Sequence, residues 1–211
     1  MLLVFIFLLA VMIIYLGIFT IALDKLGLST HTAMLLLACT LFGSGINLPL
    51  FQIKAQAPPD EEIRALQGLL FGRPLPFTGK TIIAINVGGA LIPVSFSIYL
   101  ASRNPLSATQ ILMAIAVVAA VSYFASRPVR GLGIGMPLFV APFTAALTAL
   151  LIAPENSAPL AYICGTMGVL IGADLLRLND IGKIGTPVAS IGGAGTFDGI
   201  FLTGIVAVLL A

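Results

Sequence analysis

Charged side chains are scarce in this sequence. Only 9% of its 211 residues are Asp, Glu, Lys or Arg, whereas 59% are hydrophobic and the mean hydropathy is +1.15. Soluble globular domains carry roughly 25% charged residues. The formal net charge of +2 excludes the concentrated positive surface that nucleic-acid binding requires. The composition therefore predicts a protein that lies in a lipid bilayer and has no nucleic-acid partner.

Cysteine and the familiar catalytic motifs are scarce as well. Cys39 and Cys164 lie far apart, each inside an apolar run, so they predict ordinary buried thiols and neither a disulfide framework nor a metal cluster. The sequence has no P-loop, dinucleotide fingerprint, HExxH or nucleophile elbow. These absences remove the commonest enzyme classes, and we expect no cofactor and no metal.

Long apolar runs fill most of the chain, and a bilayer core of about 30 Å needs roughly 20 apolar helical residues. The first run lacks a basic leader and a small-residue cleavage site, so we expect a retained helix and not a signal peptide. The last run is short or broken, because glycines and Asp198 stand inside it. The sequence thus predicts an all-α polytopic membrane helix bundle that forms a single domain over residues 1–211. It should have about seven transmembrane helices, of which all but the last are clear: 1–23, 30–51, 80–101, 108–126, 137–153, 158–177 and 192–211.

Basic residues are distributed unevenly among the predicted loops. The first and third loops hold only Lys25 and Arg103. The second, fourth and sixth loops hold the other basic residues: Lys54, Arg64, Arg73, Lys80, Arg127, Arg130, Arg177 and Lys183. Because cytoplasmic loops carry an excess of Lys and Arg, the even loops and the N-terminus should be cytoplasmic and the C-terminus external.

The second loop, residues 54–79, is the one long connection. Within it, "PPDEEIRALQGLLFGR" begins with two prolines and three acidic residues and ends at a glycine, as short helices do. Its apolar residues share one face: Ile63, Leu66, Leu69 and Leu70. We expect an interfacial amphipathic helix in the cytoplasmic headgroup region, with an anchoring role favoured over a substrate gate.

Two carboxylates, Asp174 and Asp198, fall inside predicted spans. A charge at mid-membrane costs at least ~2.5 kcal/mol and usually marks a pathway or a site. Counted along the helices, Asp174 lies roughly 24 Å and Asp198 roughly 20 Å from the external face. Both therefore belong to the cytoplasmic third, on consecutive helices that should pack as neighbours. We expect the two carboxyl groups to meet.

Two ordinary structural roles compete with that hypothesis. Thr196 or Asp198 can cap the amino end of a short final helix. Asp174 stands three residues before Arg177, a spacing that allows an ion pair on one helix face. Both alternatives stay open.

Polar and helix-breaking residues interrupt other apolar runs. "GSGINLPLF" and "INVGGALIPVSF" place Asn47 and Asn86 beside glycine and proline, and Gly193, Gly195 and Thr196 precede Asp198. Such interruptions are the usual pointer to a substrate or ion site in transporters, and irregular backbone at membrane depth is tolerated where it lines a cavity. Close helix packing explains the glycines equally well.

The chain resembles a family of bacterial and archaeal membrane proteins known as domain of unknown function 1614. The resemblance rests on "GINLPLF", "INVGGALIPV", "RPVRGLGIGMPLFVAP", "AYICGTMGVLIGADLL" and "SIGGAGTFDGIFLTGI" and covers nearly all residues. It implies a location in the prokaryotic cell membrane and carries no activity.

A second, shorter resemblance concerns chemistry. Asp174 in "GADLL" and Asp198 after a glycine-rich turn look like the aspartate pair of intramembrane aspartyl proteases of the presenilin and prepilin-peptidase type. The second motif in those proteases is GxGD, and here Phe197 replaces its last glycine. No Pro-Ala-Leu segment follows in an extra helix.

Three functions are consistent with these residues. The first is a peptidase for a membrane-embedded peptide, in which Asp174 and Asp198 share a proton and act as acid and base. The second is a proton- or cation-coupled transporter or channel for a small solute, in which Asn47, Asn86 and Asp198 line a broken-helix site. The third is a scaffold or accessory subunit. We favour the peptidase, because both acids lie at one height; the oligomeric state is not predicted.

Overall fold

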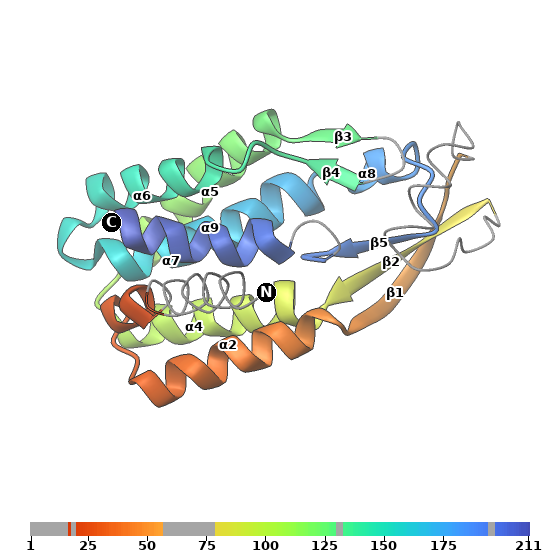
Figure 1. Cartoon of the computed structure of the whole chain (residues 1–211). Coiled ribbons are helices and arrows are strands. Elements are labelled where there is room, and N and C mark those ends of the chain that lie inside the picture. The colour runs from red at the N-terminus through yellow and green to blue at the C-terminus, as the bar shows by residue number, and fades with distance from the viewer. Residues whose placement is uncertain (1–16, 18–19, 57–78, 130–132, 194–196) are drawn as a thin grey trace, which may run out of the picture.

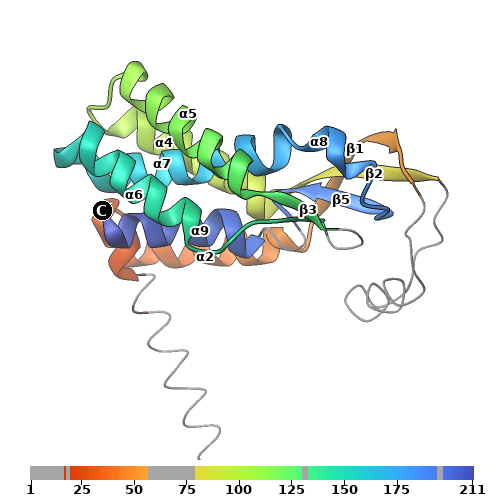
Figure 2. The same cartoon turned by 90° about the horizontal axis from the view of Figure 1, so that it is seen from above.

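The computed structural model describes residues 17, 20–56, 79–129, 133–193 and 197–211, with residues 197–199, 201 and 202 described by their backbone alone. Helices lie side by side at one end of the molecule, and strands extend from the other end (Figure 1). The view from above shows the same division (Figure 2). The principal helices are α2 (Thr30–Ser44), α4 (Ile92–Arg103), α5 (Ala108–Ala125), α6 (Val140–Ile152), α7 (Ser157–Val169) and α9 (Phe197–Leu210).

Several shorter elements join or extend these helices. The structure has two π-helices. η1 (Val87–Leu91) leads into α4, and η3 (Leu170–Leu175) follows α7 without a break. A 3₁₀ turn, η2 (Pro154–Asn156), precedes α7, and the short helix α8 (Leu178–Ile181) follows η3. π-Helical turns are rare and frequently occur at functional sites, so both are relevant to the site described below.

A sheet of three strands lies beyond one end of the helices. Its strands are β1 (Asn47–Lys54), β2 (Lys80–Asn86) and β5 (Val188–Ile191), in the order β1-β2-β5. β2 pairs antiparallel with β1 and parallel with β5. A separate hairpin is formed by β3 (Arg127–Val129) and β4 (Gly133–Gly135). The sheet is therefore mixed, and its strands pass directly into helices: α2 leads into β1, and β2 leads into η1 and α4.

Helix α7 is the centre of the helical part and packs against α4, α5, α6 and α9. All its residues except Ala158 and Met167 are buried. Glycines of α7 and η3 permit close packing against α5. A Cβ on Gly168 in α7 would lie 2.6 Å from the Val118 side chain, and one on Gly172 in η3 would lie 2.2 Å from the carbonyl oxygen of Ala119. Small residues let helix backbones approach closely.

The prediction of an all-α bundle of about seven transmembrane helices is wrong, because the fold mixes helices with a three-stranded sheet and a hairpin. The predicted spans 30–51 and 80–101 each divide into a helix and a strand. The run "TIIAI" in β2 is rich in β-branched residues, which favour strands, and Pro49 cannot lie in a helix interior. Hydropathy measures apolarity and does not distinguish a buried strand from a helix.

Two helical stretches of the described chain have the length and apolar composition of a membrane-crossing helix, Ala108–Ala125 and Pro154–Leu175. The apolar helices Thr30–Ser44, Val87–Arg103 and Val140–Ile152 are shorter. Most of the predicted span 1–23 and of the predicted amphipathic helix within 54–79 lies outside the described residues. The prediction of two buried thiols is wrong for Cys39, which is exposed on α2, and confirmed for Cys164.

Candidate functional site

The helices and the sheet meet around the side chain of Asn86, which is buried at the end of β2. Its amide nitrogen donates to the carbonyl oxygen of Ser44 at 2.7 Å and to Oδ1 of Asn47 at 3.0 Å. Its amide oxygen accepts from the backbone N–H of Gly89 at 2.7 Å and so caps η1. Ser190 in β5 donates to the same Oδ1 of Asn47. Asn86 thus joins α2, β1 and η1, and Asn47 extends the network to β5.

The glycines of this junction are needed for backbone contact. Gly192 has φ of +71°, a conformation that L side chains rarely adopt, and its carbonyl oxygen would lie 1.6 Å from a Cβ on Gly89. A Cβ on Gly193 would lie 2.5 Å from the hydroxyl of Ser190 and 3.1 Å from Oδ1 of Asn47. The segment after β5 therefore passes directly against η1, with no room for side chains at these positions.

Asp174 lies in η3 and is 6% exposed; it is the only buried charged side chain in the described part of the chain. One carboxylate oxygen, Oδ2, accepts a hydrogen bond from the backbone N–H of Gly192 at 2.7 Å. The carboxylate is therefore attached to the beginning of the glycine-rich segment that leads to Asp198. A buried carboxylate needs such donors, because its desolvation is costly.

Asp198 lies in the first turn of α9, and its side chain is outside the described part of the structure. Its backbone height can be compared with that of Asp174, because α7 and α9 cross where a Cβ on Gly204 would lie 2.9 Å from the hydroxyl of Thr166. From this crossing, Asp174 is about 12 Å along α7 and η3, and Asp198 is about 9 Å along α9, both towards the sheet. The two acidic residues therefore have similar heights on packed helices.

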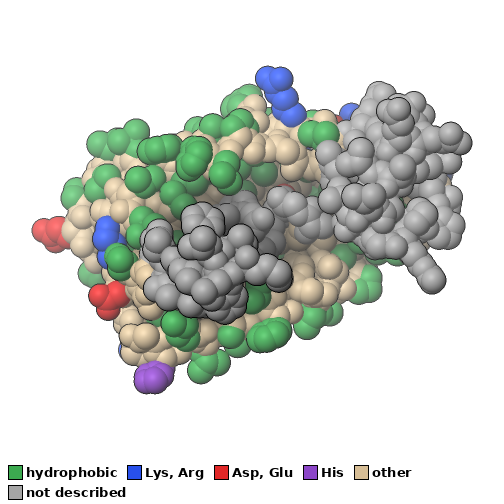
Figure 3. Space-filling model, in the orientation of Figure 1, with side chains coloured by type: hydrophobic (Ala, Val, Ile, Leu, Met, Phe, Trp, Pro, Cys, Tyr) green, Lys and Arg blue, Asp and Glu red, His purple; other side chains and the backbone are tan. Residues whose placement is uncertain are grey.

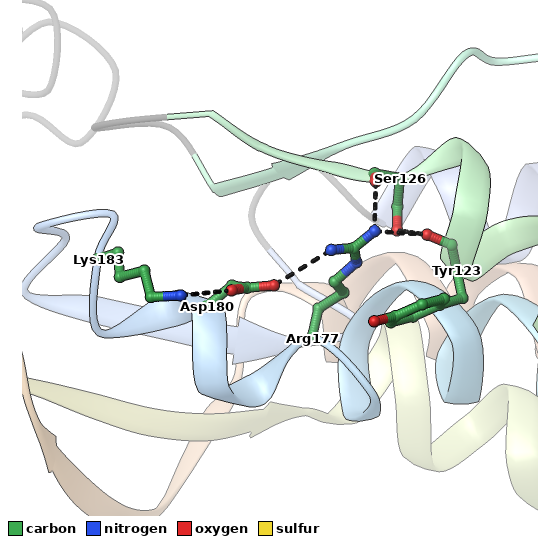
Figure 4. Close-up of polar contacts among 5 residues, drawn as sticks. All are labelled: Tyr123, Ser126, Arg177, Asp180 and Lys183. Atoms are coloured by element: carbon green, nitrogen blue, oxygen red, sulfur yellow. Dashed lines mark hydrogen bonds and ion pairs between the residues drawn. The ribbon is translucent and has the colours of Figure 1, made fainter.

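Arg177 joins the end of η3 to the end of α5 and does not pair with Asp174 (Figure 4). Its guanidinium donates to the carbonyl oxygens of Tyr123 at 2.7 Å and Ser126 at 3.0 Å. It also pairs with Asp180 at 3.2 Å and lies 4.2 Å from the centre of the Tyr123 ring. These contacts satisfy carbonyl groups at the end of α5 and hold the chain that follows Asp174.

Asp180 accepts from both neighbouring cations. Lys183 donates to one carboxylate oxygen at 3.0 Å and Arg177 donates to the other. The hydrogen bond from Lys183 is the largest cause that holds the pKa of the Asp180 carboxyl below its ordinary value, and the hydrogen bond from Arg177 is the second. The ion pair predicted for Asp174 and Arg177 is therefore replaced by one between Arg177 and Asp180.

The structure brings together four of the residues predicted from sequence. Asn47, Asn86 and Gly193 meet at one junction, and Asp174 is connected to it through Gly192. Gly195 and Thr196 lie outside the described residues, so the capping role suggested for Thr196 stays a prediction.

Sequence reasoning missed Ser190 and the bridging role of Arg177. Ser190 stands just before Gly192 and Gly193. No local spacing connects it to Asn47, which lies 143 residues earlier. Arg177 stands three residues after Asp174 and three residues before Asp180. The i,i+3 spacing to Asp180 indicates an alternative partner for its guanidinium.

No curated protein and no solved structure matches the chain. One family model matches residues 41–210, and its description is "Protein of unknown function (DUF1614)". This match confirms the family resemblance and carries no statement about a membrane or about proteolysis. The second resemblance, to intramembrane aspartyl proteases, stays a prediction.

Proposed function

We propose that this chain, which belongs to the family of unknown function DUF1614, is a membrane-embedded peptidase that uses Asp174 and Asp198 as a carboxylate pair. The single observation that carries the proposal is the attachment of the buried Asp174 carboxylate to Gly192, at the start of the segment that leads to Asp198. The alternatives differ in what these groups do, and each makes a separate prediction.

The outer surface of the helices supports the membrane location. In α5, which has a hydropathy of 1.9, only 22% of the residues are buried. A soluble protein rarely exposes so large an apolar surface. Hydrophobic side chains cover the helical part of the face in Figure 3. In α2, α4, α5 and α6, nine large hydrophobic side chains are more than half exposed: Leu35, Leu41, Phe42, Ile98, Leu112, Phe124, Phe143, Leu147 and Leu151.

Charged residues support an orientation across the prokaryotic cell membrane. At the end of the helices away from the sheet, Lys25 and Arg103 are balanced by Asp24 and Glu155. Among the described residues, and apart from Asp174 and Asp198, the sheet end has five cations and one carboxylate: Lys54, Lys80, Arg127, Arg177, Lys183 and Asp180. The positive-inside rule then places the sheet end in the cytoplasm and the C-terminus outside.

The chemistry follows from two carboxyl groups at similar depth in a low-dielectric interior. In the proposed mechanism their side chains also face each other, and a pair held close together in this way shares one proton. The ionised member removes a proton from a water molecule, whose oxygen attacks the peptide carbonyl carbon, while the protonated member donates to the carbonyl oxygen. Collapse of the tetrahedral intermediate breaks the C–N bond, and the amine leaves with a proton from the pair. The acid and base roles belong to the pair and not to one residue.

Hydrolysis by reconstituted protein tests this function. Purified full-length chain is placed in vesicles with a panel of labelled single-span peptides, and the products are identified by mass spectrometry. Asp174→Asn and Asp198→Asn should each reduce cleavage at least ~10³-fold, a loss within the range for groups that act as a unit. Asp180→Asn is the matched control, because Asp180 pairs with Arg177 and Lys183 outside the proposed pair. Full cleavage by either Asn variant of the pair contradicts the proposal.

Transport of a proton or cation is the second candidate, supported by the polar junction around Asn86. Irregular backbone, two amide side chains and a buried carboxylate meet there, as in broken-helix sites of transporters. Flux of protons or sodium into vesicles that hold no peptide would distinguish the two. A flux abolished by Asp174→Asn, together with no cleavage of any peptide, favours transport.

A further inference from the structure

An open surface cavity of about 360 Å³ lies at the sheet end, and neither Asp174 nor Asp198 is among its lining residues. It is formed where the end of β1 meets α8 and the turn that follows, and its lining residues are Lys54, Ala55, Gln56, Asn179, Gly182 and Lys183. Cavities of this size accommodate small ligands. The proposed peptidase chemistry uses none of these residues.

Backbone contacts hold the two sides of this cavity together. The N–H of Gln56 donates to the carbonyl oxygen of Gly182 at 2.8 Å. Gly182 also lies against β1, because a Cβ at this position would be 2.8 Å from the carbonyl oxygen of Lys54. The N–H of Ala55 donates to the carbonyl oxygen of Gly79 at 3.0 Å, which secures the same strand end from the other side. The lining residues are therefore held by three chain segments distant in sequence.

The charges around the cavity are mainly positive. Lys54 and Lys183 line it, and Lys80 is the register partner of Lys54 in the sheet. The carboxylate nearest to Lys183 is Asp180, which already accepts from Arg177 and Lys183. When Arg177 is included, the charged groups described around the cavity are four cations and one carboxylate. Lysine ammonium groups and amide N–H groups, such as those of Gln56 and Asn179, are suited to binding phosphate oxygens.

We propose that this cavity binds a phosphoryl group through Lys54 and Lys183. The group is supplied either by the headgroup of an anionic phospholipid or by a soluble phosphate compound, and the chemistry of recognition is the same. The two ammonium groups that line the cavity carry the charge that compensates a phosphate monoester. The proposal is independent of the peptidase function.

Lysine acylation in the full-length protein tests the proposal. The protein in neutral detergent is treated with a limiting amine-reactive ester, and the modification of each lysine is followed by mass spectrometry with and without 20 mM inorganic phosphate at constant ionic strength. A second arm uses vesicles of phosphatidylcholine alone or with phosphatidic acid. Lys25, at the opposite end of the helices where it donates to carbonyl oxygens at the end of α9, is the internal control.

We expect acylation of Lys54 and Lys183 to slow at least fivefold and that of Lys25 to stay constant. Protection by inorganic phosphate supports a soluble ligand, and protection only by phosphatidic acid supports a lipid headgroup. The double variant Lys54→Gln and Lys183→Gln should lose any increase in Tm that the protecting compound produces, whereas Lys25→Gln should keep it. Unchanged acylation in both arms, or equal protection of Lys25, overturns the proposal.

Discussion

The carboxylate of Asp174 accepts a hydrogen bond of 2.7 Å from the backbone N–H of Gly192, which lies 18 residues later in the chain. This bond joins η3 to the residue that follows β5, and so fixes a π-helix against a strand with which it forms no sheet pairing. The acid therefore has a structural role in addition to the proposed chemical one, and substitutions can separate the two.

Asp174→Ala should destabilise the protein by about 1–3 kcal/mol, because a buried N–H loses its acceptor. Asp174→Asn should cost less, because an amide oxygen can still accept from Gly192. Unfolding midpoints in mixed micelles of increasing dodecyl sulfate content measure both. Equal losses in the two variants would show that the hydrogen bond is not what stabilises this region.

Gly89→Ala should be strongly destabilising. Its Cβ would lie 1.6 Å from the carbonyl oxygen of Gly192, so either η1 or the segment after β5 must move. We expect a loss of at least about 3 kcal/mol, at the upper end of the range for overpacking. Gly45→Ala is the control, because its Cβ would lie 3.5 Å from the nearest atom and its φ is −74°. The control should be neutral or slightly stabilising, and a Gly89→Ala protein as stable as the control would contradict the described contact.

Arg177→Lys should weaken the connection between η3 and α5. A lysine keeps the charge but cannot reproduce the planar group that donates to Tyr123 and Ser126 while lying against the Tyr123 ring. The expected loss is about 1–3 kcal/mol in the same unfolding assay. Arg127→Lys, on the exposed strand β3, is the matched substitution and should be nearly neutral. Equal losses of stability in the two variants would contradict the bridging role assigned to Arg177.

Asp180 should make stability depend on pH in the acidic range. Its pKa is lowered in the folded protein by Lys183 and then by Arg177, so the folded state favours the ionised form. The contribution of ionised Asp180 to the free energy of unfolding is fully present above the pKa that this group has in the unfolded chain. It is lost as pH falls through the lower pKa of the group in the folded protein. We expect Tm to decline across that window in the parent protein and less steeply in Asp180→Asn. Identical slopes would contradict the assignment.

Only part of the fold could be predicted from the sequence. The predicted span 108–126 agrees closely with α5, since a long uninterrupted apolar run bounded by polar residues has one interpretation at that length. The runs that contain Asn47 and Asn86 match helices in hydropathy, although Pro49 disfavours a helix and the β-branched residues of β2 favour a strand. Averaging hydropathy over a span conceals a change of secondary structure within it.

The candidate site shows which relationships local sequence can indicate. Asn47 and Asn86 stand out as polar residues in apolar runs, whereas their hydrogen bond depends on the pairing of β1 with β2. The contact of Asp174 with Gly192 could not be deduced, because it depends on how β5 pairs with β2. Parallel pairing between distant strands leaves no signal in local spacing.

The parallel pairing of β2 with β5 also has a consequence for biosynthesis. Ile82 pairs with Val188, so this part of the sheet cannot form until the residues from Val87 to Val188 have been made. Pairings between such distant segments form late. Gly192 follows β5, so Asp174 acquires this hydrogen-bond donor only after β5 has been made. Under the proposed function, a nascent chain would thus remain inert towards its neighbours until that strand has joined the sheet.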